Sequence, residues 1–134
     1  MNPPSEIITL VPETYKELNS GRVRIRHGPF KVPGTSVGNG TEQYIIQNAT
    51  MPCRDCYITS IQASLEHPNG TYGNTESGMY LHHVVLLNNG RPDAVCPGFP
   101  DRFFASGNER TKFSLSLNGL VNLRIDDVLG ADTV

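Results

Sequence analysis

Two adjacent histidines, His82 and His83, are the residues of this sequence best suited to metal chemistry. Imidazole is the commonest side-chain ligand of transition metals near neutral pH, and copper accepts it readily. The pair lies within residues 79–87, the most apolar segment of the chain, where two imidazoles without a partner would be costly to bury. Any metal chemistry of this protein is therefore expected at these two residues.

The geometry of a regular strand opposes this expectation. Neighbouring side chains on a strand point to opposite faces, so the two rings would not meet at one ion. Sharing an ion requires a strong twist or a bulge at the pair. In the alternative interpretation, one histidine is a hydrogen-bonded core residue and the other lies beneath a loop. The distance between the imidazole nitrogens distinguishes these alternatives.

The cysteines form a second candidate group. Cys53-Arg-Asp-Cys56 is half of a zinc site, and no second Cys-x-x-Cys completes it. A thioredoxin-like redox motif would need a βαβ context, which the sequence does not indicate. We expect a structural disulfide, either between Cys53 and Cys56 or from one of them to Cys96.

Three sequons predict N-glycosylation, at Asn39-Gly-Thr, Asn48-Ala-Thr and Asn69-Gly-Thr. All three lie in Gly- or Thr-rich segments that are typical of loops. The N-terminus lacks the basic start and apolar stretch of a signal peptide, so either a signal has been removed or the protein is cytosolic. With the sequons and the cysteines, we expect a secreted, extracellular protein.

Composition limits the class of protein. The 134 residues suit one domain, and with 37% hydrophobic and 18% charged residues the chain is not disordered by composition. The net charge is −2, and acidic and basic residues are mixed along the chain. This argues against a nucleic-acid partner, which would need a one-sided basic surface. No apolar run is long enough to span a membrane. The sequence indicates neither a substrate nor an oligomeric state.

Strand signals dominate over helix signals. Glycines and prolines are scattered, which divides the chain into short segments and favours a β-sandwich. Residues 21–27 alternate as a half-buried strand with an outer row of arginines, and only residues 13–18 could form a turn or two of helix. Long loops are expected over residues 28–42 and 67–78. The remaining expected strands are 7–11, 44–47, 57–65, 79–87 and 102–105.

The C-terminal part predicts a hairpin over residues 112–125 with a type I′ turn at Asn118-Gly119. In that register Leu115 would face Asn122 and Phe113 would face Arg124. Either a bulge restores the pattern, or residues 119–134 are a diverged or truncated tail that does not continue the sheet. We expect one antiparallel β-sandwich of jelly-roll type over residues 1–134, with residues 1–20 as an N-terminal arm.

A family resemblance adds to these inferences. Residues 78–87, Gly-Met-Tyr-Leu-His-His-Val-Val-Leu-Leu, and residues 102–110, Arg-Phe-Phe-Ala-Ser-Gly-Asn-Glu-Arg, resemble the copper type II, ascorbate-dependent monooxygenases. These are the peptidylglycine and dopamine hydroxylases. Residues 21–117 are also similar to uncharacterised secreted fungal proteins with the same core. The resemblance implies a β-sandwich in which a His-His pair on a strand binds the electron-transfer copper.

The chain departs from that family in its ligands. The family has a third histidine downstream of the pair, whereas the other histidines here, His27 and His67, both precede it. The second copper site of the family, with two histidines and a methionine, has no counterpart. We therefore expect a copper-binding, monooxygenase-like domain that is not catalytically complete alone, with His27 or His67 as a third ligand if the fold brings either near. The alternative is a secreted, glycosylated binding or structural module without a metal.

Overall fold

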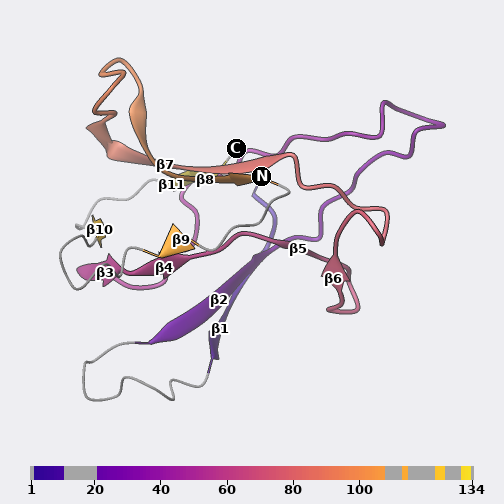
Figure 1. Ribbon diagram of the computed structural model, residues 1–134, viewed down its shortest axis with the longest axis horizontal. Coiled ribbons are helices and arrows are strands. Elements are labelled where there is room, and N and C mark those ends of the chain that lie inside the picture. Colours follow the sequence, from indigo (N-terminus) through magenta and orange to yellow (C-terminus); the bar gives the residue numbers. More distant parts are fainter. Residues whose placement is uncertain (1, 11–20, 108–112, 115–122, 126–130, 134) are drawn as a thin grey trace. The chain divides into compact units, whose positions relative to one another are not determined.

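A computed structural model describes residues 2–10, 21–107, 113–114, 123–125 and 131–133 of the chain, with side chains up to residue 107 (Figure 1). The described residues form strands and loops without a helix, and every strand pair is antiparallel. The prediction of an all-β protein is therefore confirmed. No helix in the described ranges could cross a membrane. The helical turns expected at residues 13–18 lie outside these ranges.

The chain divides into two compact units, which are described one at a time. The first unit is Met1–Gln43 with Thr50–Pro52, and the second is Tyr44–Ala49 with Cys53–Val134. A single domain over residues 1–134 stays a prediction.

The first unit is built on one β-ribbon. Strands β1 (Ser5–Leu10) and β2 (Arg22–His27) pair from Ser5 opposite His27 to Leu10 opposite Arg22. The alternation predicted for β2 is observed from Arg22 to Ile25, where the arginines are exposed and Val23 and Ile25 are half-buried, whereas Arg26 is half-buried as well. In the outer row, Arg26 lies opposite Glu6 and forms an ion pair with it at 3.7 Å. The segment called an N-terminal arm thus contains a paired strand, and residues 28–42 form the expected loop.

The second unit contains a three-stranded sheet in the order β11-β7-β8. Its strands are β7 (His83–Pro92), β8 (Pro100–Gly107) and β11 (Ala131–Thr133). β7 is therefore the central strand of this sheet, and it begins at His83 rather than at Met79, where the strand was expected to begin. Its side chains from Val84 to Leu87 are half-buried.

Short strand pairs make up the rest of the second unit. Strand β3 (Cys56–Ile58) pairs with β10 (Leu123–Ile125), and β4 (Ser60–Ile61) pairs with β9 (Phe113–Ser114). A hairpin joins β5 (Leu65–Glu66) to β6 (Tyr72–Gly73), so part of the expected loop 67–78 is a strand. The strand expected at 57–65 is broken into three pieces.

Two expected strand assignments need correction. Residues 44–47 form a single bridge at Ile46 instead of a strand. The hairpin expected at 112–125 has its turn outside the described residues, and its described ends pair with other partners. Phe113 lies opposite Ile61, and Leu123 lies opposite Ile58. These partners account for the register conflict of the expected hairpin. In the described residues, each of its two strands pairs with the segment 56–61 and not with the other strand.

The described core is small. Its buried apolar side chains are Ile46, Leu81 and Phe104, with 6%, 8% and 6% of their surface exposed. Phe103 is half-buried in β8, whereas Phe99 is 66% exposed because it lies in the loop before β8.

Candidate metal centre

The backbone changes character between the two histidines. His82 precedes β7 and lies outside the strand ladder, whereas His83 is the first residue of β7 and lies opposite Gly107 of β8. On the N-terminal side, the buried Leu81 anchors the chain. Neighbouring side chains alternate between opposite faces only within a strand. The alternation therefore does not apply to His82 and His83, because only His83 belongs to the strand.

The two imidazole rings face each other. Nδ1 of His82 lies 2.6 Å from Nδ1 of His83, and the ring centroids are 4.6 Å apart with an interplanar angle of 58°. In an N–H···N hydrogen bond one ring donates and the other accepts, so one Nδ1 presents a lone pair. The two rings therefore lie on the same side of the chain, close enough for a direct hydrogen bond, and they do not diverge to opposite faces.

This volume is at the surface. Both histidines are exposed, and Tyr80 lies beside them with its ring centroid 6.4 Å from that of His82. The expectation that the pair is buried within an apolar strand is therefore wrong, because β7 begins only at His83. An exposed pair is open to an ion from solvent.

The histidines expected as third ligands are placed differently. Nε2 of His67 lies 3.1 Å from the Ser77 hydroxyl, to which it is hydrogen-bonded. His27 is at the end of β2 in the first unit, where its Nδ1 is buried with no hydrogen-bond partner among the described residues, and burial lowers its pKa. Across the described residues, no three His, Cys, Asp or Glu side chains gather where they could hold a metal ion. A third ligand stays a prediction.

The donor pair itself fits a metal that accepts imidazole. Two nitrogens that each lie ~2.0 Å from one ion at a tetrahedral angle are about 3.3 Å apart. The observed separation of 2.6 Å is shorter than this value, so the two rings would have to move apart to hold one ion. Binding would also displace the proton that the two nitrogens share.

Comparison with known proteins points in the same direction. The chain is 37% identical over 100 residues to the probable copper-dependent oxygenase M1 of Phoma sp., which covers 72% of this chain. It is also 44% identical over 63 residues to the probable copper-dependent oxygenase clz3 of Cochliobolus lunatus, which covers 44% of this chain. The chain is a homologue of proteins named as copper-dependent oxygenases. No family model and no solved structure matches it.

The matched part of these copper-dependent oxygenase relatives is small. The alignments cover 25% of the Phoma protein and 20% of the Cochliobolus protein. The relatives are therefore several times longer than the segment that they share with this chain.

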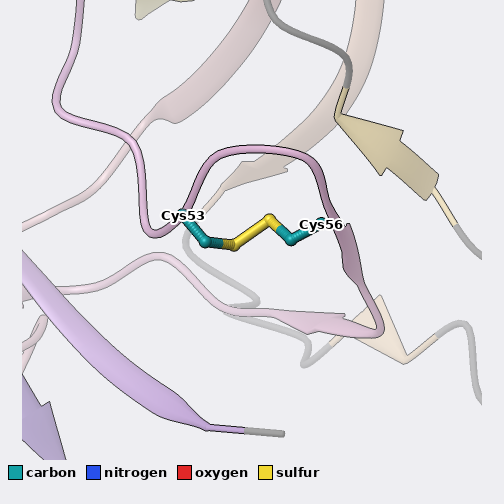
Figure 2. The surroundings of a disulfide bond; sticks show 2 residues. All are labelled: Cys53 and Cys56. Carbon is teal, nitrogen blue, oxygen red and sulfur yellow. A yellow bond between two sulfur atoms is a disulfide. The ribbon is translucent and has the colours of Figure 1, made fainter. Parts of the chain in front are cut away.

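In this homologue of copper-dependent oxygenases, the cysteine alternatives are resolved by a disulfide. Cys53 and Cys56 are joined across a turn that leads into β3, as Figure 2 shows. Cys96 has a free, half-buried thiol. The alternative pairing with Cys96 is therefore wrong, and the local Cys-x-x-Cys spacing closes the bridge instead.

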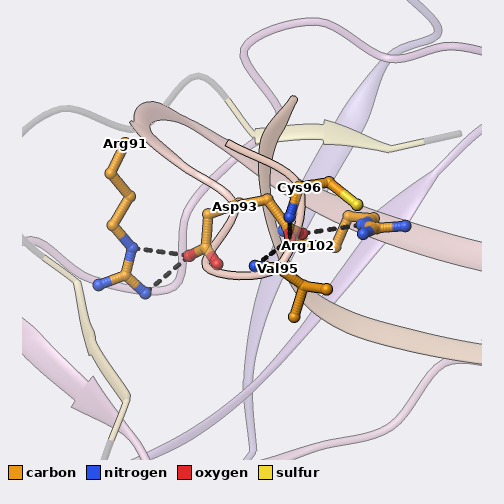
Figure 3. A network of polar contacts seen from close by, with 6 residues as sticks. Arg91, Asp93, Val95, Cys96 and Arg102 are labelled. Atoms are coloured by element: carbon orange, nitrogen blue, oxygen red, sulfur yellow. Dashed lines mark hydrogen bonds and ion pairs between the residues drawn. The ribbon is translucent and has the colours of Figure 1, made fainter. Parts of the chain in front are cut away.

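A polar network that the sequence did not single out joins the β7–β8 loop to β8 (Figure 3). One carboxylate oxygen of Asp93 accepts hydrogen bonds from the backbone N–H groups of Val95 and Cys96, both at 2.9 Å. The other oxygen accepts from Nε of Arg102 at 2.8 Å. Asp in a turn after Pro92 is a recognisable signal for such backbone capping.

The network perturbs both charged groups. The Arg102 guanidinium and the two backbone donors hold the pKa of Asp93 well below its usual range, and Asp93 in turn raises the pKa of Arg102. Asp93 is 7% exposed and accepts bonds on both oxygens, so it holds the loop rather than reaching a ligand. A second ion pair, Arg91 with Asp101 at 2.7 Å, closes the same end of the β7–β8 pair.

Proposed function

We propose that this chain is a copper-binding, monooxygenase-like domain in which His82 and His83 hold the ion. The observation that carries the proposal is the approach of the two Nδ1 atoms to 2.6 Å at an exposed strand end. The names of the two relatives support copper as the metal. Copper binds imidazole nitrogen readily, which agrees with this donor set.

Each part of the chain has a limited role in this proposal. Bound copper supplies one-electron and oxygen chemistry. His82 and His83 supply two neutral nitrogen ligands, and the ladder from His83 opposite Gly107 fixes the position of the second ring. A jelly-roll sandwich would be the scaffold. Among the described residues no third ligand joins the pair, so we propose that the chain is not complete for turnover alone.

Equilibrium dialysis against Cu²⁺ tests the proposal. The wild-type chain should bind one copper ion, and a His82→Ala, His83→Ala variant should lose this binding. Removal of an outer-shell partner already weakens a metal site by about 10–100-fold, so removal of both ligands should have a larger effect. Circular dichroism should show that the variant keeps its strands, because both side chains are exposed.

A His27→Ala, His67→Ala variant is the matched control, because it removes the same number of imidazoles elsewhere. This control variant should bind copper much more tightly than the His82→Ala, His83→Ala variant. Equal copper uptake by the wild-type chain and the variant of the pair would contradict the proposal. In that case the alternative function, a binding or structural β-module without a metal, would be favoured.

A further inference from the structure

We propose that Asn69 is the residue of this chain that accepts an N-linked glycan, in preference to the sequon residues Asn39 and Asn48. The proposal concerns a surface loop and rests on no metal. All three asparagines are exposed, so exposure does not distinguish them. The three sequons differ in the contacts that their threonines make.

The Asn69 sequon occupies the tip of the β5–β6 hairpin. The tip is closed by His67 N–H donating to the Thr71 carbonyl and by Gly70 N–H donating to the His67 carbonyl, both at 2.8 Å. Gly70 has a φ of +82°, which a glycine adopts without strain. Each flanking strand has only two residues, so a short ladder holds the exposed tip.

Thr71 binds the acceptor side chain directly. Its hydroxyl donates to Oδ1 of Asn69 at 2.7 Å, and its backbone N–H donates to the same oxygen at 3.0 Å. Both bonds use the carbonyl side of the amide, which leaves Nδ2 directed away from Thr71. Two donors on Oδ1 also draw charge from the amide, so a proton leaves Nδ2 more readily.

The other two sequons lack this arrangement. Asn39 accepts a bond from the backbone N–H of Thr41 at 3.1 Å, and the described contacts give it no bond from the Thr41 hydroxyl. At the third sequon, the hydroxyl of Thr50 is hydrogen-bonded to the Ser5 hydroxyl at 2.6 Å. Asn48 itself has a φ of +52°, a left-handed conformation in which an asparagine is held in a turn.

The modification is a glycosyl transfer from a lipid-diphosphate-linked oligosaccharide. Nδ2 of Asn69 forms a bond to the anomeric carbon of the first sugar, and the bond from that carbon to the diphosphate oxygen breaks. The lipid diphosphate leaves with the bonding electrons, and a base of the transferase takes the proton from Nδ2. No oxidation or reduction occurs.

Secretion of the full 134-residue chain from a yeast host tests this proposal. An N-glycanase should release the glycans in heavy-oxygen water, so that each occupied asparagine becomes a labelled aspartate. Peptide mass spectrometry then reads the occupancy of each sequon. The label separates enzymatic release from deamidation that occurred earlier, and a parallel incubation without the N-glycanase measures the deamidation of the exposed Asn-Gly pairs in the heavy-oxygen water.

The expected result is an occupancy at Asn69 several-fold above that at Asn39 or Asn48. An Asn69→Gln variant should lose the main glycoform, a Thr71→Ser variant should keep it, and an Asn48→Gln control should not change it. The occupancies measured on the wild-type chain test the proposal even if a variant fails to fold. An unmodified Asn69, or equal or higher occupancy at either other sequon, would overturn the proposal.

Discussion

At the scale of single residues, the direction of side chains decides what the histidine pair can do. Residue types alone place two imidazoles next to each other, but alternation on a strand would separate them. His82 lies outside the ladder and His83 inside it, and this one-residue boundary lets the two Nδ1 atoms approach. Strand boundaries are the least certain part of a sequence pattern, so the orientation of the rings could not be predicted.

Asp93 is a second residue whose role depends on contacts rather than on type. An Asp93→Asn substitution keeps an acceptor for the N–H groups of Val95 and Cys96 but removes the charge that faces Arg102. The pKa of Asp93 is lowered in the folded chain, so its stabilisation is complete above the unfolded value of about 3.9. This stabilisation is lost as the pH falls from there toward the folded value.

Thermal unfolding of the Asp93→Asn variant should therefore show a lower melting temperature than the wild type at pH ~7, and the gap should narrow below pH ~4. An Asp101→Asn variant is the control, because the side chain of Asp101 is 17% exposed against 8% for that of Asp93, while their arginine partners are equally exposed at 52% and 51%. Its melting temperature should fall less. A gap for Asp93→Asn that persists unchanged at pH ~3 would contradict this account.

At the scale of elements, patterns with a clear period were reliable. The alternation from Arg22 to His27 predicted β2, and the apolar run ending at Leu87 predicted the central strand β7. Short segments without a period were not reliable. Residues 44–47 are as β-branched as a strand, but among the described residues they form only one bridge, at Ile46. Local sequence does not encode which partner a strand finds.

Phe104 is the element-scale test of the β7–β8 pair. It lies opposite Leu86 and is 6% exposed, so a Phe104→Ala substitution should lower the free energy of unfolding by about 3 kcal/mol. The matched control is Phe99→Ala in the preceding loop, where the ring is 66% exposed. That variant should change stability by about 0.5 kcal/mol or less. Urea denaturation measures both, and equal effects would show that Phe104 does not anchor the sheet.

At the scale of the whole molecule, composition and the mixed charge predicted an all-β protein and argued against a nucleic-acid partner. The resemblance to copper monooxygenases agrees with the names of the two relatives. The sequence could not place the third ligand. His67 is hydrogen-bonded to Ser77 and His27 lies in the other unit, so neither prediction is confirmed. Ligand sets assembled from distant segments depend on packing that no local motif encodes.

Electron paramagnetic resonance of the chain loaded with one equivalent of Cu²⁺ tests the central claim most directly, because the modulation of the signal reports the imidazoles bound to the ion. The wild-type chain should give a signal with at least two coordinated imidazoles. The His82→Ala, His83→Ala variant should give the spectrum of copper in buffer. An unchanged imidazole signal in this variant would contradict the assignment of His82 and His83 as the copper ligands.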